Sequence, residues 1–352
     1  MSVTTPLLSI RGLVTEFDTP DGVVHAVDQV SYDVYPGETL GVVGESGSGK
    51  SVTVMAALGL IPQPPGRIVS GEIWLEDRDL LTLPQAELRK VRGKDIAMVF
   101  QDPMTSLNPV LTVGHQIAEA ITTHERGISD QLARKRTVEL LELVGVPNAE
   151  GRFTQYPHEY SGGMRQRAMI AMAIANEPKV LVADEPTTAL DVTIQAQVLK
   201  VLKTAQEETN AGTVLITHDL GVIAEMADRV VVMYGGKVVE TGTVHEIFHQ
   251  PSHPYTLGLL SSLPRKERRL TKLEPIPGQP PSLINRPRGC TFHPRCRLAA
   301  DRERCRTEEP ELRALGQGRA SACHFHDEMP DEVARISATT GALRGGPPQE
   351  DG

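Results

Sequence analysis

The run Gly-Glu-Ser-Gly-Ser-Gly-Lys-Ser at residues 44–51 constrains the fold more than any other part of this chain. It follows a strand-like segment, residues 39–43, and precedes a stretch with a helical pattern. In that context the spacing G-x-x-x-x-G-K-[ST] is typical of a phosphate-binding loop. Its glycines let backbone N–H groups turn toward phosphate oxygens, and the following helix directs its positive end at them. A simple helix cap would need neither the lysine nor the full spacing, so we expect a nucleotide as ligand.

Every residue of this loop, and the one after it, is a candidate nucleotide contact. Lys50 would supply a mobile cation for the phosphates, and Ser51 would ligate Mg²⁺. The full predicted set is Gly44, Glu45, Ser46, Gly47, Ser48, Gly49, Lys50, Ser51 and Val52.

Length and charge limit the classes of protein to consider. The chain has 352 residues, enough for one large or two medium domains, and a net charge of −9. The acidic balance argues against a general nucleic-acid partner, because binding to a phosphate backbone needs a basic face. No apolar run approaches the roughly 20 residues of a membrane-spanning helix, and the first nine residues lack the features of a signal peptide. We therefore expect a cytoplasmic chain.

The hydrophobic pattern predicts an α/β core. Residues 7–43 read as short strands, with a turn at residues 19–22. The apolar runs at residues 180–183 and 213–217 flank a helical segment at residues 193–208. This is the pattern of buried parallel strands.

Two further regions differ from this core. Residues 101–178 have a helical pattern, as in the three- and four-residue apolar steps of residues 131–144, which indicates a helical insertion. Past about residue 254 the sequence becomes rich in Pro and Arg, which marks a domain boundary or linker. Residues 327–352 are polar and rich in Gly, Pro and acidic residues, so we expect them to be disordered.

Two carboxylates, Asp184 and Glu185, end the first of the buried apolar runs. Parallel α/β sheets place their ligands at the carboxyl ends of strands. Asp184 would hold Mg²⁺, and Glu185 would polarise the water that attacks the γ-phosphate. Without a phosphate loop nearby, such a pair would simply be a helix N-terminus with favourable charge.

A second anion site is indicated far along the chain. Ser161, Gly162 and Gly163 open a helical run, so their amides lie at a helix N-terminus. Gln166 belongs to the same motif, Ser-Gly-Gly-Met-Arg-Gln. One chain therefore carries two surfaces suited to phosphate.

Together with Gln101, the run Ala189-Leu-Asp191 and His218, these motifs resemble the ATP-binding subunit of an ABC transporter over residues 7–250. The resemblance implies an α/β P-loop ABC ATPase core, with a RecA-like parallel sheet and an antiparallel β subdomain, plus a helical subdomain. It implies a Walker A loop at residues 44–51, a Walker B strand at residues 180–184, a signature motif at residues 161–166, the Q-loop glutamine Gln101, a D-loop ending at Asp191 and the switch histidine His218.

The resemblance also implies how the site works. Two such subunits close head to tail, so that the signature motif of one caps the γ-phosphate held by the other. ATP binding then favours the closed pair of subunits, and hydrolysis of ATP allows the pair to open again. Glu185 and His218 would be the catalytic residues, while Ser51, Gln101 and Asp184 would hold Mg²⁺. Phe17 is either the aromatic that stacks on adenine or a half-buried strand residue, and such stacking would also tolerate GTP.

The segment at residues 101–109 contains Pro and Asn, and we expect it to be a loop. In the family this region and the helical insertion receive a short helix of a membrane subunit. Met104, Leu107 and Val110 are either apolar contacts to that helix or core residues. The implied partners are two integral-membrane permease subunits, a second, related ATP-binding subunit and, indirectly, an extracytoplasmic solute-binding protein. The implied location is peripheral, at the cytoplasmic face of the cell membrane.

All four cysteines lie between residues 290 and 323, with the spacings C-x5-C, C-x8-C and C-x17-C. Such clustering suggests a shared ligand, and disulfides are disfavoured in a reducing cytoplasm. This segment resembles the C-terminal extension of ATP-binding subunits from oligopeptide and dipeptide importers. That resemblance favours a 4Fe-4S cluster on Cys290, Cys296, Cys305 and Cys323. Zinc, with His293, His324 or His326, and free structural thiols are the alternatives.

The resulting prediction is an ATPase that energises import of di- or oligopeptides. The expected domains are an ABC nucleotide-binding domain at residues 1–253, with its helical subdomain at about 102–178, a cysteine-rich extension at residues 254–326 and a disordered tail. Nickel or another small solute is an alternative cargo. An alternative function is that of a soluble ABC ATPase in DNA repair or translation, although this chain shows one cassette and no coiled-coil insertion.

Overall fold

The computed structural model describes residues 5–188, 191–262 and 275–340. The described chain forms two compact units, each built from segments that are distant in sequence. The first unit comprises residues 1–9, 33–39 and 74–216, and the second comprises residues 10–32, 40–73 and 217–352. This division does not follow the expected domain boundaries, which stay a prediction.

A parallel sheet forms the centre of the first unit. Its strands β6 (Ile96–Val99), β7 (Val180–Asp184) and β8 (Gly212–Ile216) lie in the order β8-β7-β6, with Val182 opposite Val214. Every residue of β7 and β8 is buried, which explains why both strands read as continuous apolar runs. The predicted strands are confirmed to within one residue at each end.

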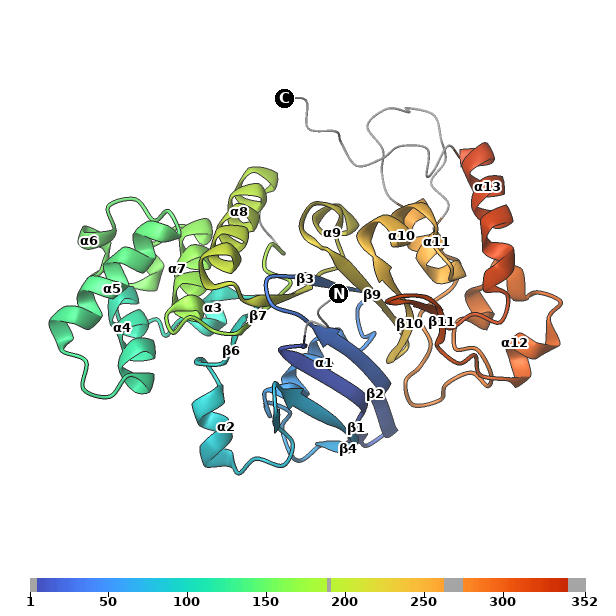
Figure 1. Cartoon of the computed structure of the whole chain (residues 1–352), viewed down its shortest axis with the longest axis horizontal. Coiled ribbons are helices and arrows are strands. Elements are labelled where there is room, and N and C mark those ends of the chain that lie inside the picture. Colours follow the sequence, from blue (N-terminus) through green and yellow to red (C-terminus); the bar gives the residue numbers. More distant parts are fainter. Residues whose placement is uncertain (1–4, 189–190, 263–274, 341–352) are drawn as a thin grey trace. The chain divides into compact units, whose positions relative to one another are not determined.

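The helical subdomain is confirmed as part of the first unit (Figure 1). Helices α4 (Val113–His124), α5 (Asp130–Leu143) and α7 (Gly162–Ile174) pack against one another, and α7 also packs against α8 (Val192–Thr209). Side-chain caps fix where these helices begin, since Thr112 and Ser129 accept hydrogen bonds from amides in the first turns of α4 and α5. The smaller elements of this unit are β5 (Arg78–Asp79), α2 (Gln85–Val91), α3 (Pro103–Ser106), α6 (Ala149–Arg152) and a 3-10 turn at Pro157–Glu159.

The expected loop at residues 101–109 contains one helical turn, α3. The carboxylate of Asp102 accepts a hydrogen bond from the Met104 amide at 2.8 Å, which satisfies a donor at the start of that turn. The prediction that the whole segment is a loop was therefore wrong for Pro103–Ser106. A short aspartate cap gives little signal beside the Pro and Asn residues that favour a loop.

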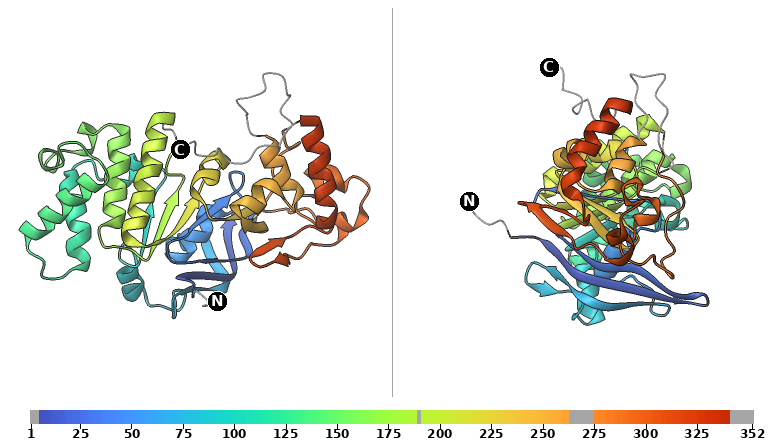
Figure 2. Two further views of the ribbon diagram at one scale, coloured as in Figure 1. Left: turned by 45° about the horizontal axis from the view of Figure 1, so that its top comes forward. Right: turned by 90° about the vertical axis from the view of Figure 1, so that its right-hand side faces the viewer.

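The antiparallel β subdomain lies mostly in the second unit. Strands β1 (Leu8–Thr19) and β2 (Gly22–Val34) are neighbours, and β4 (Gly66–Leu75) pairs on the other side of β1. The turn was predicted correctly, but β1 and β2 span 12 and 13 residues and are not short. This hairpin is drawn in dark blue in Figure 2.

The second unit also contains the strands that flank the phosphate loop. Strand β3 (Thr39–Val43) pairs in parallel with β9 (Arg229–Tyr234), and β9 pairs antiparallel with β10 (Lys237–Thr243). The order continues through β12 (Arg319–Ser321) to β11 (Arg313–Gly316), so the cysteine-rich extension adds two strands to this sheet. The helices of the unit are α1 (Lys50–Ala57), α9 (Leu220–Met226), α10 (Val244–His249), α11 (Pro254–Ser261), α12 (Glu303–Thr307) and α13 (Met329–Thr340), with 3-10 turns at His293–Arg295, Arg297–Ala299 and His326–Glu328.

Helix α13 corrects the prediction of a disordered tail from residue 327. Met329 is 1% exposed and packs with Leu257 of α11, and Leu298 and Val333 lie against this pair. Burial of these few apolar side chains stabilises the helix. The mostly polar composition of the segment does not reveal this packing. Residues 341–352, the rest of the predicted tail, lie outside the described residues.

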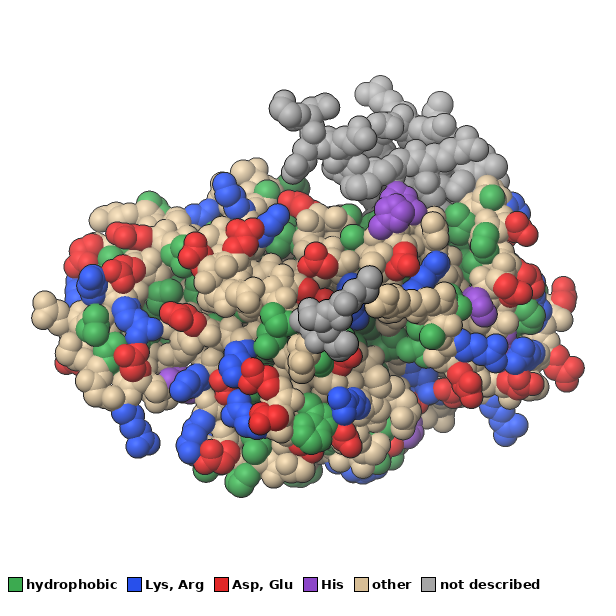
Figure 3. Space-filling model, in the orientation of Figure 1, with side chains coloured by type: hydrophobic (Ala, Val, Ile, Leu, Met, Phe, Trp, Pro, Cys, Tyr) green, Lys and Arg blue, Asp and Glu red, His purple; other side chains and the backbone are tan. Residues whose placement is uncertain are grey.

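Charged side chains of both signs are distributed over the described surface (Figure 3). On the face shown in Figure 3, Lys and Arg side chains are interspersed with Asp and Glu. No helix in the described part of the chain is long and apolar enough to cross a membrane.

Candidate nucleotide-binding site

The phosphate loop connects β3 to α1 in the second unit, as predicted. Lys50 is 6% exposed, and its ammonium group donates to the carbonyl oxygens of Gly44 at 2.7 Å and Glu45 at 3.0 Å. The lysine thus folds back over the start of the loop. A cation held in this way keeps a positive charge beside the loop amides.

Two glycines of the loop approach neighbouring backbone so closely that no side chain fits. A Cβ at Gly44 would lie 2.2 Å from the carbonyl oxygen of Met233 in β9. A Cβ at Gly49 would lie 2.4 Å from that of Ala26 in β2, and Gly49 also has φ +97°. The hydroxyl of Ser48 is buried and has no hydrogen-bond partner among the described residues. This orphaned donor fits a loop that closes around a phosphate.

The structure brings Gln101 and Glu185 together in the first unit. Glu185 follows β7 with φ +47°, a rare conformation for a residue with a side chain, and its amide donates to the carbonyl of Ile216 at 2.9 Å. Its Oε2 accepts hydrogen bonds from Gln101 Nε2 and Thr188 Oγ1, both at 2.9 Å. The carboxylate is therefore oriented by neutral donors. Asp184, the last residue of β7, is buried.

The predicted signature segment opens α7. Ser161 Oγ accepts from the Met164 amide at 3.3 Å, so the serine caps the helix, while Ser161 and Gly162 are exposed. Gln166 is 1% exposed, and its Nε2 has no hydrogen-bond partner within the described ranges. Asp191 caps α8 in the same manner, accepting from Ile194 at 3.0 Å. The other D-loop residues, 189 and 190, lie outside the described part of the chain.

The remaining predicted nucleotide contacts belong to the second unit. His218 is exposed one residue after Thr217, at the end of the predicted strand. Phe17 is half-buried on β1, and its ring edge lies next to Gly66. Two residues that contact the phosphate loop were not predicted, namely Tyr255 and Arg295. They are 210 and 250 positions from Glu45, so no local pattern marks them.

The three apolar residues expected near Gln101 differ in how far their side chains are exposed. Met104 and Val110 are 56% and 75% exposed, whereas Leu107 is 2% exposed. Leu107 is therefore a core residue, and the other two face solvent. Arg165 of α7 lies with its Nη1 2.9 Å from the sulfur of Met104.

The four cysteines are free thiols in the second unit. Burial raises the pKa of Cys290 to about 12 and of Cys296 to about 11, and neighbouring thiols add to the effect. Burial likewise raises the pKa of Cys323 to about 12, and the other three cysteines all contribute. The four thiols are therefore near enough to influence one another's pKa, and the Cys290 amide donates to the Cys305 carbonyl at 2.9 Å. No group of three or more His, Cys, Asp or Glu side chains in the described ranges is arranged to hold a metal ion.

Backbone amides point at these sulfurs. The amides of Phe292 and His293 lower the pKa of Cys290, and so act against the effect of burial. Amides two and three residues after Cys296 do the same for that thiol. The histidine rings face backbone carbonyls, since Nδ1 of His293 lies 2.9 Å from the Cys290 oxygen and Nδ1 of His326 lies 3.2 Å from that of Cys323.

The fold and these motifs define an ATP-binding cassette of the ABC type. Residues 27–188 match the family model described as "ABC transporter", and residues 239–305 match "Oligopeptide/dipeptide transporter, C-terminal region". The chain belongs to the ATP-binding subunits of the oligopeptide and dipeptide ABC transporters. It is therefore an ABC ATPase that binds ATP.

Similar proteins cover most of the chain. The oligopeptide transport ATP-binding protein OppD of Bacillus subtilis (strain 168) is 56% identical over 82% of this chain and 80% of that protein. The dipeptide transport ATP-binding protein DppD of Escherichia coli (strain K12) is 50% identical over 91% of this chain and 96% of that protein. Among solved structures, a dimeric, post-hydrolysis state of the ATP-binding cassette MJ0796 bound to ADP and phosphate has a TM-score of 0.61 and 28% identity, covering 67% of this chain and 98% of that one.

The packing of α7 against α8 predicts different effects of substitution at the adjacent glycines Gly162 and Gly163. A Cβ at Gly163 would lie 2.8 Å from Ile194 Cγ2, whereas a Cβ at Gly162 meets no atom within 4 Å. We expect Gly163→Ala to lower the free energy of unfolding by about 1–3 kcal/mol through overpacking. Gly162→Ala, the matched control, should leave it unchanged or slightly higher. Thermal melting of the purified variants measures this, and equal melting temperatures would contradict the α7–α8 packing.

Proposed function

We propose that this ATPase subunit energises the import of di- or oligopeptides through partner permease chains. The observation that carries the proposal is the 50–56% identity to peptide transport ATP-binding proteins, together with the match of residues 239–305 to the oligopeptide/dipeptide transporter C-terminal region.

The residue roles in ATP hydrolysis are part of this proposal. The loop amides and Lys50 would bind the phosphates. Ser51 of the second unit and Gln101 and Asp184 of the first are each proposed as ligands for the Mg²⁺ that would neutralise phosphate charge. Glu185 takes a proton from the attacking water, and the donors on its Oε2 orient it for that task. The positive φ of Glu185 supports this role, since strained backbone concentrates at functional sites.

Other nucleotide contacts complete the proposed site. His218 contacts the γ-phosphate and stabilises its charge, and Phe17 stacks on the base. The exposed N-terminus of α7, with Ser161, Gly162 and Gly163, caps the phosphate held by a partner ATPase subunit. Asp191 and Gln166 are proposed to belong to this same interface, although the side chain of Gln166 is buried in this structure.

The proposed assembly contains two membrane-embedded permeases and a second, related ATPase, so that the working pair is a heterodimer. The dimeric state of the solved cassette supports the pairing of two such chains. The exposed side chains of Met104 and Val110 offer apolar contacts for a short permease helix. The proposed location is the cytoplasmic face of the membrane, with an extracytoplasmic binding protein delivering the peptide.

The cysteines are proposed to hold a 4Fe-4S cluster. Cys290, Cys296, Cys305 and Cys323 would be its ligands, and the backbone amides beside Cys290 and Cys296 act against the effect of burial on the pKa of those thiols, although no group of these side chains in the described ranges is arranged to hold a metal ion. When bound, such a cluster would supply structural linkage or redox sensing, since ATP hydrolysis needs no electron transfer.

Substitutions in the first and second units separate binding from chemistry. Lys50→Ala should abolish ATP binding, whereas Glu185→Gln should bind ATP and hydrolyse it about 10²–10⁴-fold more slowly, because a general base is lost. Glu177→Gln is the control, since Glu177 is an exposed glutamate that also has positive φ. ATP binding and single-turnover hydrolysis measure both effects. Unchanged turnover in Glu185→Gln would overturn the assignment of the base.

The cysteine assignment has its own test. Protein purified anaerobically should contain four iron and four sulfide per chain with the visible absorbance of a cluster, and Cys323→Ser should lose both. His324→Gln, the matched neighbour, should keep them, because the Nε2 of His324 faces the Glu308 carbonyl. Zinc in place of iron, or no metal at all, would contradict the cluster and leave the ATPase assignment intact.

A further inference from the structure

We propose that Arg295, which the cysteine-rich extension carries, is a positioning residue for the phosphate loop. Both lie in the second unit. The Nη1 and Nη2 atoms of Arg295 donate to the two carboxylate oxygens of Glu45 at 2.5 and 3.0 Å. A bidentate pair of this kind fixes orientation as well as distance. The inference rests on the proposed assignment of residues 44–51 as the ATP phosphate site.

Glu45 is held at every polar group that it contributes to the loop. Its carboxylate meets Arg295, its amide donates to the hydroxyl of Tyr255 at 2.8 Å, and its carbonyl accepts from Lys50 at 3.0 Å. Because the next peptide units begin at this residue, its position sets where the following amides and the lysine ammonium lie. A shift of Glu45 would therefore misplace the groups that receive phosphate.

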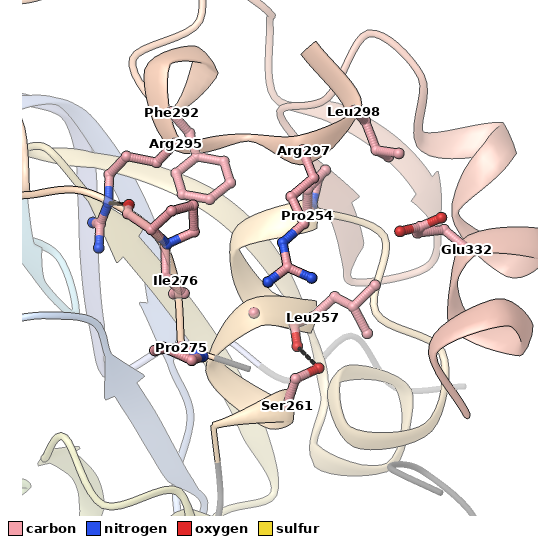
Figure 4. Close-up of a pocket in the computed structure, with 12 residues that line it drawn as sticks. Pro254, Leu257, Ser261, Pro275, Ile276, Phe292, Arg295, Arg297, Leu298 and Glu332 are labelled. Carbon is pink, nitrogen blue, oxygen red and sulfur yellow. Dashed lines mark hydrogen bonds between the residues drawn. The ribbon is translucent and has the colours of Figure 1, made fainter. Parts of the chain in front are cut away.

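Arg295 is itself fixed before any ligand arrives. Its side chain is 6% exposed, its Nε donates to the carbonyl of Pro277 at 2.8 Å and its Nη1 to the hydroxyl of Tyr234 at 3.3 Å. Figure 4 shows this hydrogen bond to the 275–277 segment and shows the guanidinium turned away from that of Arg297. Because these contacts already fix the arginine side chain, little conformational entropy is lost when it positions Glu45.

An aromatic cluster ties the segment that carries Arg295 to the body of the unit. Phe292 meets Tyr234 edge-on at 5.1 Å between ring centroids and Tyr255 at 5.4 Å. Tyr255 is the residue that accepts from the Glu45 amide, so the same cluster supports both contacts to the loop. Arg295 lies between Cys290 and Cys296 in sequence, and the order of the cysteine segment is thereby coupled to the phosphate loop.

The test measures MgATP affinity and steady-state ATPase kinetics on the purified full-length chain. Arg295→Met should raise both the Kd for ATP and the KM by about 10- to 100-fold, because a small displacement of a positioned loop is costly. The kcat should change much less, since the lost interaction serves bound ATP and the transition state alike. The Kd for ATP of Arg295→Lys should lie between those of the wild type and Arg295→Met, because an ammonium group keeps the charge but not the bidentate contact.

Two comparisons separate positioning from general destabilisation. Arg286→Met is the matched control, because Arg286 comes from the same extension, is 15% exposed and pairs with Asp28 on β2. It should lower the melting temperature without changing the Kd for ATP. In a Glu45→Gln background, Arg295→Met should weaken binding no further, since Arg295 acts through that carboxylate.

The outcomes distinguish this inference from the site assignment. Wild-type affinity in Arg295→Met, or an equal loss of affinity in Arg286→Met, would overturn the positioning role. If Arg295→Met does not fold, Arg295→Lys decides, and an unchanged Kd in that variant would have the same meaning. Retained ATP binding in Lys50→Ala would instead overturn the phosphate-loop assignment on which the inference rests.

Discussion

Close backbone packing around the phosphate loop is the constraint on which the rest of the second unit depends. The loop leaves β3 and runs so near to β9 and β2 that Gly44 and Gly49 meet carbonyl oxygens at distances no Cβ tolerates. A residue with a side chain at either position would displace this backbone, which leads directly into α1 at Lys50. The sheet order that places β9 beside β3 is needed for the loop as much as for the core.

In the first unit, the carboxylate of Glu185 is held at a fixed orientation just after the buried strand β7. The backbone turns sharply at Glu185, and Gln101 and Thr188 fix one carboxylate oxygen. Because Gln101 starts the segment that includes α3, movement of that segment would reach Glu185 through one hydrogen bond. This gives a physical route from the segment proposed to meet a permease to Glu185, the proposed general base.

Features with a local cause were predictable from the sequence. Strands β3, β7 and β8 have continuous apolar runs, α5 has a clear three- and four-residue period, and the phosphate loop has its own spacing. Arg295 and Tyr255 were missed because their contacts with Glu45 span more than 200 positions, and a charged residue among cysteines resembles any other surface arginine. Helix α13 was missed because its polar composition conceals the packing of Met329 on Leu257.

We expect this chain to hydrolyse ATP as one of two ATPases on a peptide permease. The most direct test is to purify Glu185→Gln from its native membranes with ATP and Mg²⁺, which should trap the closed assembly, and to identify the retained chains by mass spectrometry. Two polytopic membrane chains and a second, related ATPase should be retained with it. Recovery of the chain alone in the soluble fraction, or together with ribosomes or DNA, would contradict this expectation.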